Sequence, residues 1–275
     1  MSLRGCYHVC ARLADAIAGT HPHGRLFHPQ WLAIRAQRAG MRDAATFASG
    51  VLIDVGCGVK PYASWFCPRV DAYVGLEYPV TAGRNGTPAS KVDVFADALA
   101  LPLRDRAANT ALLTEVLEHL PEPGRALEEI HRTLDADGTL ILTSPMIYNI
   151  HGGPHDFFRF TPYGLESLLS RHGFRIVEMR PFGYFGSMLG MMINNFVTTL
   201  IWRSTMLRVL RVTILLPMFP LFFALVNVTG WAVDRLFKGE EFTIGHLVIA
   251  RKRVDGRRSD IADQRLGDVM KIAHA

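Results

Sequence analysis

Cysteine is scarce in this sequence: its 275 residues contain only Cys6, Cys10, Cys57 and Cys67. They form no C-x-x-C pair, and their density is far below that of a secreted, disulfide-stabilised domain, so we expect free thiols in a reducing cytoplasm. Cys6 and Cys10 flank His8, but this spacing fits one face of a short helix better than a metal site. The sequence therefore predicts no metal site.

The sequence also predicts no signal peptide. The only apolar stretch near the N-terminus is interrupted by Arg4, Arg12 and Asp15, so we do not expect export. The excess of one charge sign is small, with 30 Lys and Arg against 25 Asp and Glu. Such a mildly basic surface tolerates a phospholipid headgroup or a nucleic acid and requires neither. The chain shows no internal repeat and no RNA-binding module, and we predict no nucleic-acid partner.

Apolar residues, by contrast, are plentiful at 49%, enough for one α/β core with residues left over. After Gly50, short β-like and helix-like patterns alternate, which predicts a mostly parallel sheet with helices on both faces. The predicted strands span residues 51–55, 72–77, 91–95, 110–114, 138–143, 175–180 and 242–250. The predicted helices span residues 61–66, 124–134 and 161–172, and Asp137-Gly138 predicts a turn before the fifth strand.

This pattern divides the chain into four parts. Residues 1–45 are predicted to be a helical N-terminal segment, and residues 254–275 a polar tail. The α/β domain takes residues 46–183 and 241–253, so that the apolar residues 184–240 form a helical insertion before the last strand.

The stretch VLIDVGCGVKPY begins the α/β domain and carries its first candidate ligand-binding residues. Ligands of a parallel sheet bind beyond the carboxyl ends of the strands, and this strand delivers Asp54, Gly56 and Gly58 to that edge. Glycine there permits a ligand to approach the backbone closely. Taken alone, the pattern is better explained by a strand that ends in a tight turn.

The next two strands end in acidic residues at the same edge. Glu77 follows the glycine turn by about twenty residues, a spacing at which a carboxylate can accept both ribose hydroxyls of an adenosine cofactor. Asp97 follows the third strand, where it can accept a hydrogen bond from an adenine amine while Ala98 and Leu99 pack on the ring. The alternative for Glu77 is a solvated residue at a strand end, but three such features in register favour a cofactor site.

Five segments then occur in a fixed order: VLIDVGCG, GLE, DALALPL, TEVLEHLPEP and ALEEIHRTLDADGTLILTSP. Their order and spacing strongly resemble class I S-adenosylmethionine-dependent methyltransferases, especially bacterial proteins related to ubiquinone-biosynthesis C-methyltransferases. The resemblance covers residues 25–183 and implies a Rossmann-like fold of seven strands with S-adenosylmethionine as cofactor. It implies that Asp54, Gly56 and Gly58 line the methionine and sulfonium, Glu77 the ribose and Asp97 the adenine, with Thr114 and Glu115 beside the methionine.

Two competing classes lack their motifs here. The dinucleotide pattern G-x-G-x-x-G would need a third glycine where the chain has Pro61, which disfavours hydride transfer. The N/D-P-P-Y/F/W element of adenine-N6 and cytosine-N4 methyltransferases is replaced by TEVLEHL.

The segment SPMIYNIHGGPHDFFRFTPYGLESLL, after the fifth strand, is dense in titratable and aromatic residues and is expected to select the acceptor. If the acceptor is a hydroxyl, a base must remove its proton, and an imidazole suits that task. Our candidates are His155 and His151, with Asp156 orienting a ring. The alternative is structural: Asp156 caps the next segment and Arg159 holds the loop in an ion pair. For Glu118 and His119 we favour a structural or cofactor-proximal role.

Within the insertion, residues 184–202 and 212–233 are uncharged and long enough to span a bilayer. The loop between them carries Arg203, Arg208 and Arg211. In a transmembrane hairpin this loop would face away from the cytoplasm, whereas short arginine-rich loops favour the cytoplasmic side. We therefore expect helices that lie in or dip into the cytoplasmic leaflet of the inner membrane, the second broken at Pro217 and Pro220. A dimerisation surface or extra core is the alternative.

The sequence thus predicts a class I methyltransferase that acts on oxygen, or less favourably carbon, of a small or lipid-linked acceptor such as a glycan lipid or quinone-like ring. The rival hypothesis is a catalytically silent, methyltransferase-like scaffold bound to membrane. An intact set of Asp54, Gly56, Gly58 and Glu77 argues against that rival.

Overall fold

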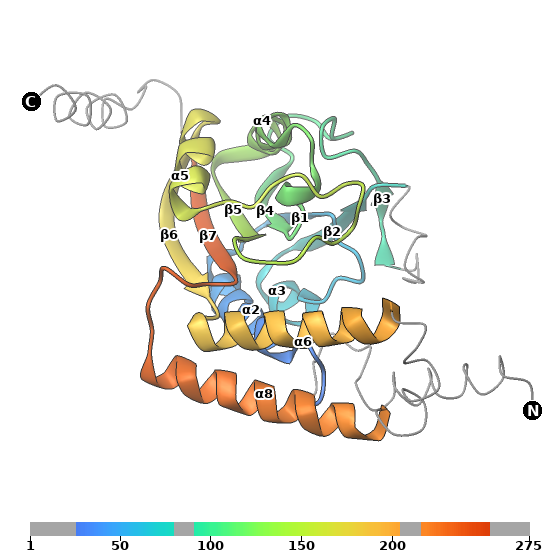
Figure 1. Cartoon of the computed structure of the whole chain (residues 1–275). Coiled ribbons are helices and arrows are strands. Elements are labelled where there is room, and N and C mark those ends of the chain that lie inside the picture. The colour runs from blue at the N-terminus through green and yellow to red at the C-terminus, as the bar shows by residue number, and fades with distance from the viewer. Residues whose placement is uncertain (1–25, 80–90, 204–215, 254–275) are drawn as a thin grey trace, which may run out of the picture.

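A single seven-stranded sheet organises the computed structural model, which describes residues 26–79, 91–203 and 216–253 (Figure 1). Its strand order is β3-β2-β1-β4-β5-β7-β6. The strands are β1 Val51–Val55, β2 Ala72–Glu77, β3 Val94–Phe95, β4 Ala108–Thr114, β5 Leu134–Pro145, β6 Phe174–Phe182 and β7 Gly245–Lys252. Only β7 is antiparallel, to both β5 and β6. The predicted fold class is confirmed.

β1 and β2 have their predicted bounds, whereas the other five strands differ from theirs by up to four residues. The third strand was expected over residues 91–95, but β3 contains only Val94–Phe95. The expected turn at Asp137-Gly138 is wrong, because both residues lie inside β5, which begins at Leu134. Asp137 adopts a positive φ of 59°, and the pairing with β4 shifts its register there. The pair therefore forms a bulge that lengthens the strand rather than a turn that precedes it.

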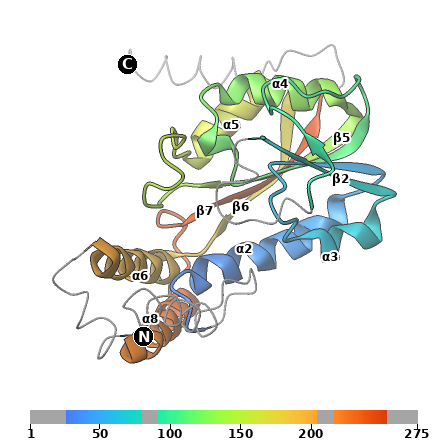
Figure 2. The same cartoon turned by 90° about the vertical axis from the view of Figure 1, so that its right-hand side faces the viewer.

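Helices cover both faces of the sheet (Figure 2). Helices α4 (Pro123–Thr133) and α5 (Pro162–Arg171) lie on one face, and α2 (Trp31–Ala44) and α3 (Ala63–Phe66) on the other. Short 3-10 turns follow α2, α3 and β4, at Ala45–Phe47, Cys67–Arg69 and Leu117–His119. Successive residues of a strand point to opposite faces, so one apolar strand contributes side chains to the cores on both faces of the sheet. Ile53 joins the core under α4 and α5, whereas its neighbour Leu52 joins the core under α2 and α3.

The apolar insertion forms two helices, α6 (Phe185–Arg203) and α8 (Leu216–Leu236), outside the α2 face (Figures 1 and 2). The predicted break at the prolines is wrong, since α8 continues past Pro220. Pro220 lies about one turn into the helix, where its missing N–H removes at most one intrahelical hydrogen bond. No helix among the described residues is long and apolar enough to cross a bilayer.

Polar and small residues join α6 to α8. A Cβ added to Gly186 would lie 2.2 Å from the carbonyl oxygen of Gly230, so the two backbones are in direct contact. Buried Asn194 donates to the Oδ1 atom of buried Asn227 at 3.0 Å. Asp234 accepts hydrogen bonds from the first backbone N–H groups of α6, at Tyr184 and Ser187, which satisfies donors that the helix itself cannot.

Several predictions concern residues 1–25, 80–90, 204–215 and 254–275, which lie outside the described residues. These are the first part of the N-terminal helical segment with Cys6, His8 and Cys10, the arginines Arg208 and Arg211, and the polar tail. They stay predictions, as do the four domain boundaries.

Candidate functional site

The loop after β1 brings the first predicted residues together at the carboxyl end of the sheet. Gly56 and Gly58 have positive φ angles of 76° and 49°, in the region that only glycine adopts without strain. The N–H groups of Gly56 and Cys57 both donate to the carbonyl oxygen of Leu76, at 2.9 and 3.0 Å. This turn therefore folds back onto the end of β2.

Glu77 ends β2 directly against this loop. Its Oε2 atom accepts a hydrogen bond of 2.9 Å from the N–H of Gly58, and Oε1 accepts one of 3.1 Å from the N–H of Tyr78. The carboxylate is thus held at the sheet edge beside the glycine loop, at the place where the sequence expected a ribose partner.

Gly75 of β2 lies under this loop and was not predicted from the sequence. A Cβ at Gly75 would lie 2.3 Å from Cε of Lys60 and 2.7 Å from Sγ of Cys57. The N–H of Gly75 donates to Asp93, which also forms an ion pair with Lys60. A glycine in the middle of β2 lets the loop lie on the strand, and an interior strand glycine was the available signal.

Asp54 is the buried acid of the cofactor edge. Only 2% of its surface is exposed, and its Oδ2 atom accepts a 2.5 Å hydrogen bond from the hydroxyl of Tyr73. Burial raises the pKa of Asp54 to about 7, against the smaller lowering effects of Tyr73 and Lys60. Sequence reasoning missed Tyr73, because its alignment with Asp54 depends on the β1–β2 register.

The predicted adenine residues follow β3. Asp97 is exposed, and its Oδ1 atom accepts a 2.9 Å hydrogen bond from the N–H of Leu99. Ala98 is half-buried and packs against the core under α4 and α5. The structure thus brings Asp97, Ala98 and Leu99 into one turn just past the strand that neighbours Glu77.

Thr114 and Glu115 end β4, beside β1. Glu115 has a positive φ of 55°, a strained conformation for a non-glycine residue. Its N–H donates to the carbonyl oxygen of Thr143 at 3.1 Å. Burial of the carboxyl group raises the pKa of Glu115 to about 7, although hydrogen bonds from Thr143 and Gln37 lower it. Gln37 reaches this edge from α2 and was not foreseen.

The segment 146–160, hereafter the acceptor loop, is held by Asp156 and Arg159. The Arg159 guanidinium contacts both oxygens of Asp156, at 2.6 and 2.9 Å, and holds the pKa of that carboxyl well below its usual range. The N–H of His151 donates to Oδ2 of Asp156 at 2.8 Å. Arg159 can therefore hold the loop through this ion pair while Asp156 orients the His151 ring, so the two predicted roles are compatible.

The two histidines predicted as bases occupy different environments. His155 is exposed, and its ring lies 6.3 Å from that of Phe157. His151 is half-buried, with Nδ1 3.7 Å from Asp156 and its ring 4.9 Å from that of Tyr148. Burial is the main cause that lowers the pKa of His151, and the neighbouring His119 lowers it further. The ring is therefore neutral near pH 7, as a proton acceptor must be.

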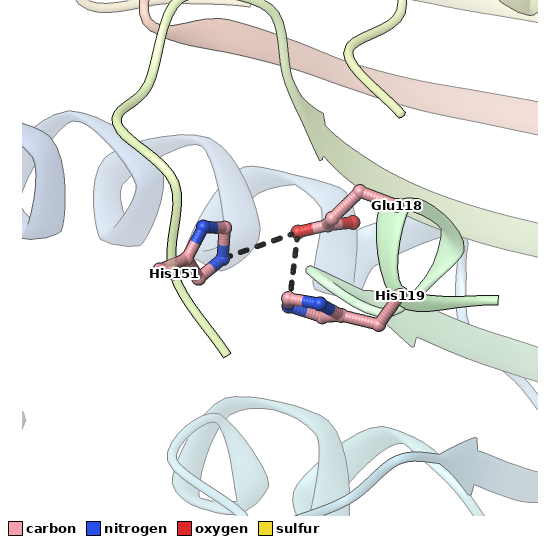
Figure 3. A group of neighbouring side chains, drawn as sticks. All are labelled: Glu118, His119 and His151. Carbon is pink, nitrogen blue, oxygen red and sulfur yellow. Dashed lines mark ion pairs between the residues drawn. The ribbon is translucent and has the colours of Figure 1, made fainter. Parts of the chain in front are cut away.

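Glu118 and His119 lie directly against His151 (Figure 3). Glu118 is fully buried, and its Oε1 atom is 3.8 Å from Nε2 of His119 and 3.9 Å from Nε2 of His151. Burial, and next the charge of Glu115, raise the pKa of Glu118 to about 9. The backbone carbonyl of Glu118 accepts hydrogen bonds from Phe157 and Phe158, which fastens the acceptor loop over the end of β4.

Comparison with known proteins was informative for the central part of the chain. Residues 53–142 match the methyltransferase domain family. An uncharacterised methyltransferase of Mycobacterium leprae is 32% identical over 108 residues, 38% of this chain and 39% of that protein. One of Mycobacterium ulcerans is 30% identical over 130 residues, 45% of this chain and 46% of that protein. The chain thus spans less than half the length of these relatives.

Solved structures share the fold at low identity. The [4+2]-cyclase SpnF superposes with a TM-score of 0.52 and 21% identity, covering 82% of this chain and 83% of that one. A candidate sarcosine dimethylglycine methyltransferase from Galdieria sulphuraria superposes with a TM-score of 0.50 and 17% identity, covering 80% and 87%. At such identities the likeness concerns the fold alone.

The strand order, the glycine loop and the acid at the end of β2 define a Rossmann-like fold, in which we expect an adenosine cofactor at the ends of β1 and β2. Together with the family match, they show that the chain carries a class I S-adenosylmethionine-dependent methyltransferase domain. Its cofactor is S-adenosylmethionine.

Proposed function

We propose that the protein transfers the methyl group of S-adenosylmethionine to an oxygen atom of a small or lipid-linked acceptor. The observation that carries this proposal is a half-buried imidazole, His151, beside the ends of β4 and β5, whose burial lowers its pKa and favours the neutral ring. Transfer breaks the bond between sulfur and the methyl carbon and forms a bond from that carbon to oxygen. S-adenosylhomocysteine is released, and the hydroxyl proton must pass to a base.

His151 is the better placed of the two predicted bases. A neutral ring must carry one hydrogen, and the Nδ1 atom of His151 lies 3.3 Å from the carbonyl oxygen of Asn149, which can only accept. Arg159 Nη2 is 3.4 Å from the same nitrogen, but it already donates to Asn149 and Asp156, both at 2.9 Å. Nδ1 therefore bears the hydrogen, and the lone pair of Nε2 is directed at the site.

Positioning supplies the rest of the catalysis in this proposal. Displacement at a sulfonium requires the acceptor oxygen to lie in line with the sulfur and the methyl carbon, and such alignment alone gives a large rate increase. The acceptor loop is fixed at Glu118 and Asp156 by backbone and ion-pair contacts. Asp54 and Glu77 hold the cofactor side, so the two reactants meet across the ends of β1 and β4.

An amphipathic acceptor is supported by the position of the insertion. Nδ2 of Asn195 on α6 donates to Oδ1 of Asn149 in the acceptor loop at 2.7 Å. Apolar side chains at least half exposed on α6 and α8 include Phe196, Leu200, Met218, Leu221, Leu225 and Leu236. Exposed apolar surface of this extent is typical of a membrane or protein contact. We propose that it rests on the cytoplasmic leaflet of a membrane and delivers a lipid-linked acceptor to the loop.

Methyl transfer is tested by incubating the full chain with radiolabelled S-adenosylmethionine and a lipid extract, and separating labelled lipids. The account expects label in an alkali-stable methyl ether, formation of which falls at least tenfold in His151→Gln. A His155→Gln variant, with its exposed ring, is expected to lose less. Folded protein that binds no S-adenosylmethionine would favour the silent scaffold instead.

Membrane contact is tested separately by vesicle flotation with neutral and anionic vesicles. The full chain is expected to float, while a Leu221→Glu/Leu225→Glu variant stays in the soluble fraction. Val177→Glu, at an exposed apolar residue of β6, is the control and should float like the parent. A parent that stays soluble and elutes as a dimer would assign the apolar surface to self-association.

A further inference from the structure

Three acceptor atoms face one another at the end of β4. They are Oε1 of Glu118, Nε2 of His119 and Nε2 of His151, and all three lie within 4.8 Å of one another. Figure 3 shows both rings directed at the same carboxylate oxygen. The rings themselves meet edge to face, with centroids 4.7 Å apart.

Each ring nitrogen that faces Glu118 carries a lone pair. Nδ1 of His119 lies 2.5 Å from the carbonyl oxygen of His155, and Nδ1 of His151 lies 3.3 Å from that of Asn149. A carbonyl oxygen accepts only, so in a neutral ring the hydrogen lies on Nδ1. Metal-bound histidines show the same arrangement, because their second nitrogen donates to a carbonyl or carboxylate.

Glu118 has no partner that would explain its position. Its side chain is fully buried, and neither carboxylate oxygen has a hydrogen-bond partner among the described residues. A buried carboxylate without a partner costs several kcal/mol, so Glu118 stays protonated in the absence of a cation, and a bound cation would take the place of that proton. The two imidazoles supply no hydrogen, and their distances of 3.8 and 3.9 Å exceed hydrogen-bond length.

The spacing suits a cation between the three groups. Ligand atoms about 2.1 Å from a tetrahedral ion are roughly 3.4 Å apart, so shifts of a few tenths of an ångström bring Glu118 into range of each ring. The His119 and His151 side chains are 26% and 31% exposed, which leaves the cluster open to solvent on one side.

We propose that Glu118, His119 and His151 bind one divalent transition-metal ion through one carboxylate oxygen and two imidazole nitrogens. Two imidazoles and a carboxylate suit Zn²⁺, Mn²⁺ and Fe²⁺, and three protein ligands leave a coordination position open. This inference reverses the expectation from sequence that the chain has no metal site.

The open position gives the ion a role that rests on the proposed function. An acceptor hydroxyl bound there loses its proton to water at a lower pH, because the cation stabilises the alkoxide. In that state His151 is a ligand and positions the acceptor through the ion, whereas in the ion-free state it is the base. Loss of activity on chelation, restored by the ion, separates the two states.

The binding test uses the full chain after chelation and desalting, without S-adenosylmethionine or acceptor. Mn²⁺ and Zn²⁺ are titrated by calorimetry, and Co²⁺ by its visible absorption, which reports coordination. One ion is expected per chain, with affinity at least 30-fold weaker in Glu118→Gln and in His151→Gln. Retained S-adenosylmethionine affinity in these variants shows that they are folded.

Two controls exclude other sites. His172→Gln removes a histidine that lies 3.4 Å from the exposed Glu128 and should keep full affinity. Cys6→Ser/Cys10→Ser removes thiols outside the described residues and should also keep the Mn²⁺ site. No stoichiometric binding by the parent, or binding unchanged in both Glu118→Gln and His151→Gln, overturns the metal site. Cofactor binding and methyl transfer would survive that result, so the two proposals fail separately.

Discussion

The ligand-binding edge of the sheet has two halves, one at the ends of β1 and β2 and one at the end of β4. They differ in the hydrogen bonds that their carboxylates accept. At the ends of β1 and β2, Glu77 accepts backbone hydrogen bonds from Gly58 and Tyr78, and Asp54 accepts one from Tyr73. At the end of β4, both oxygens of buried Glu118 lack a hydrogen-bond partner within the described part of the chain. In the first half only Oδ1 of Asp54 lacks such a partner, whereas neither oxygen of Glu118 has one, and we propose that a bound cation completes the second half.

This difference matches the division of labour that we propose. A cofactor is the same in every turnover, so a site held by internal hydrogen bonds can bind it without rearrangement. An acceptor that must be oriented and deprotonated requires groups whose protonation is unsettled, and strongly shifted pKa values are typical of such sites. The pKa of Glu118 is raised to about 9, further from its usual value than that of Asp54 in the cofactor half, which is raised to about 7.

The close packing of the glycine loop in the cofactor half is tested by replacing Gly56 and Gly58 with alanine. A Cβ at Gly56 would lie 2.4 Å from Cγ2 of Val116, whereas a Cβ at Gly58 meets nothing within 4 Å. Overpacking and backbone strain together should lower the free energy of unfolding of Gly56→Ala by about 3 kcal/mol. Strain alone should cost Gly58→Ala about 1 kcal/mol, while S-adenosylmethionine affinity falls about tenfold. Urea unfolding measures the stabilities, and calorimetry measures the affinity for S-adenosylmethionine. Equal losses of stability in Gly56→Ala and Gly58→Ala would contradict the expected difference between the two glycines.

The acceptor half is tested by Glu118→Gln, measured in the presence of chelator. Its pKa is raised from near 4.5 when unfolded to about 9 when folded, so the stability of the parent falls as pH rises between these values. Glu118→Gln should lack this loss and exceed the parent by about 2 kcal/mol at pH 8. Glu77→Gln, on the satisfied carboxylate, should show no gain. Urea unfolding from pH 5 to 9 compares the three proteins, and parallel curves for Glu118→Gln and parent would refute the raised pKa of Glu118.

A smaller effect is expected on the pH dependence of cofactor binding. The folded pKa of Asp54 is about 7, and its ionised form attracts the cationic cofactor by about 1 kcal/mol. Affinity should therefore rise about fivefold from pH 6 to pH 8. In the parent, the hydrogen bond from Tyr73 lowers the pKa of Asp54. Tyr73→Phe removes this bond and should therefore move the midpoint of the binding profile to higher pH. A flat profile in both proteins would show that Asp54 does not meet the sulfonium.

The sheet could be predicted because its strands repeat one local signal. Runs such as Val51–Val55 and Ala72–Glu77 are apolar on both faces and end in turn residues, and parallel strands align their carboxyl ends. The cofactor edge followed from that alignment. The bulge at Asp137 could not be predicted, because a positive φ there depends on pairing with β4.

The cluster at Glu118 was beyond sequence reasoning for a similar cause. His119 and His151 are 32 positions apart, and they meet because Phe157 and Phe158 donate to the Glu118 carbonyl and fix the loop path. The sequence identified His151 and Asp156 as functional candidates but preferred the exposed His155 as the base. Residue type indicated both histidines, but the sequence alone did not show that His151 is half-buried and His155 exposed.

The central claim is that Glu77 and the glycine loop bind S-adenosylmethionine, and calorimetric titration of the purified chain tests it most directly. Hydrogen bonds from ribose hydroxyls to a carboxylate contribute roughly 1.5–3 kcal/mol each. Micromolar affinity is expected for the parent, and it should fall at least about 50-fold in Glu77→Ala, which should remain folded although it loses the hydrogen bonds to Gly58 and Tyr78. Glu166→Ala, at an exposed carboxylate of α5, should bind like the parent. Equal affinity of Glu77→Ala and parent, or no binding by the folded parent, would contradict the account.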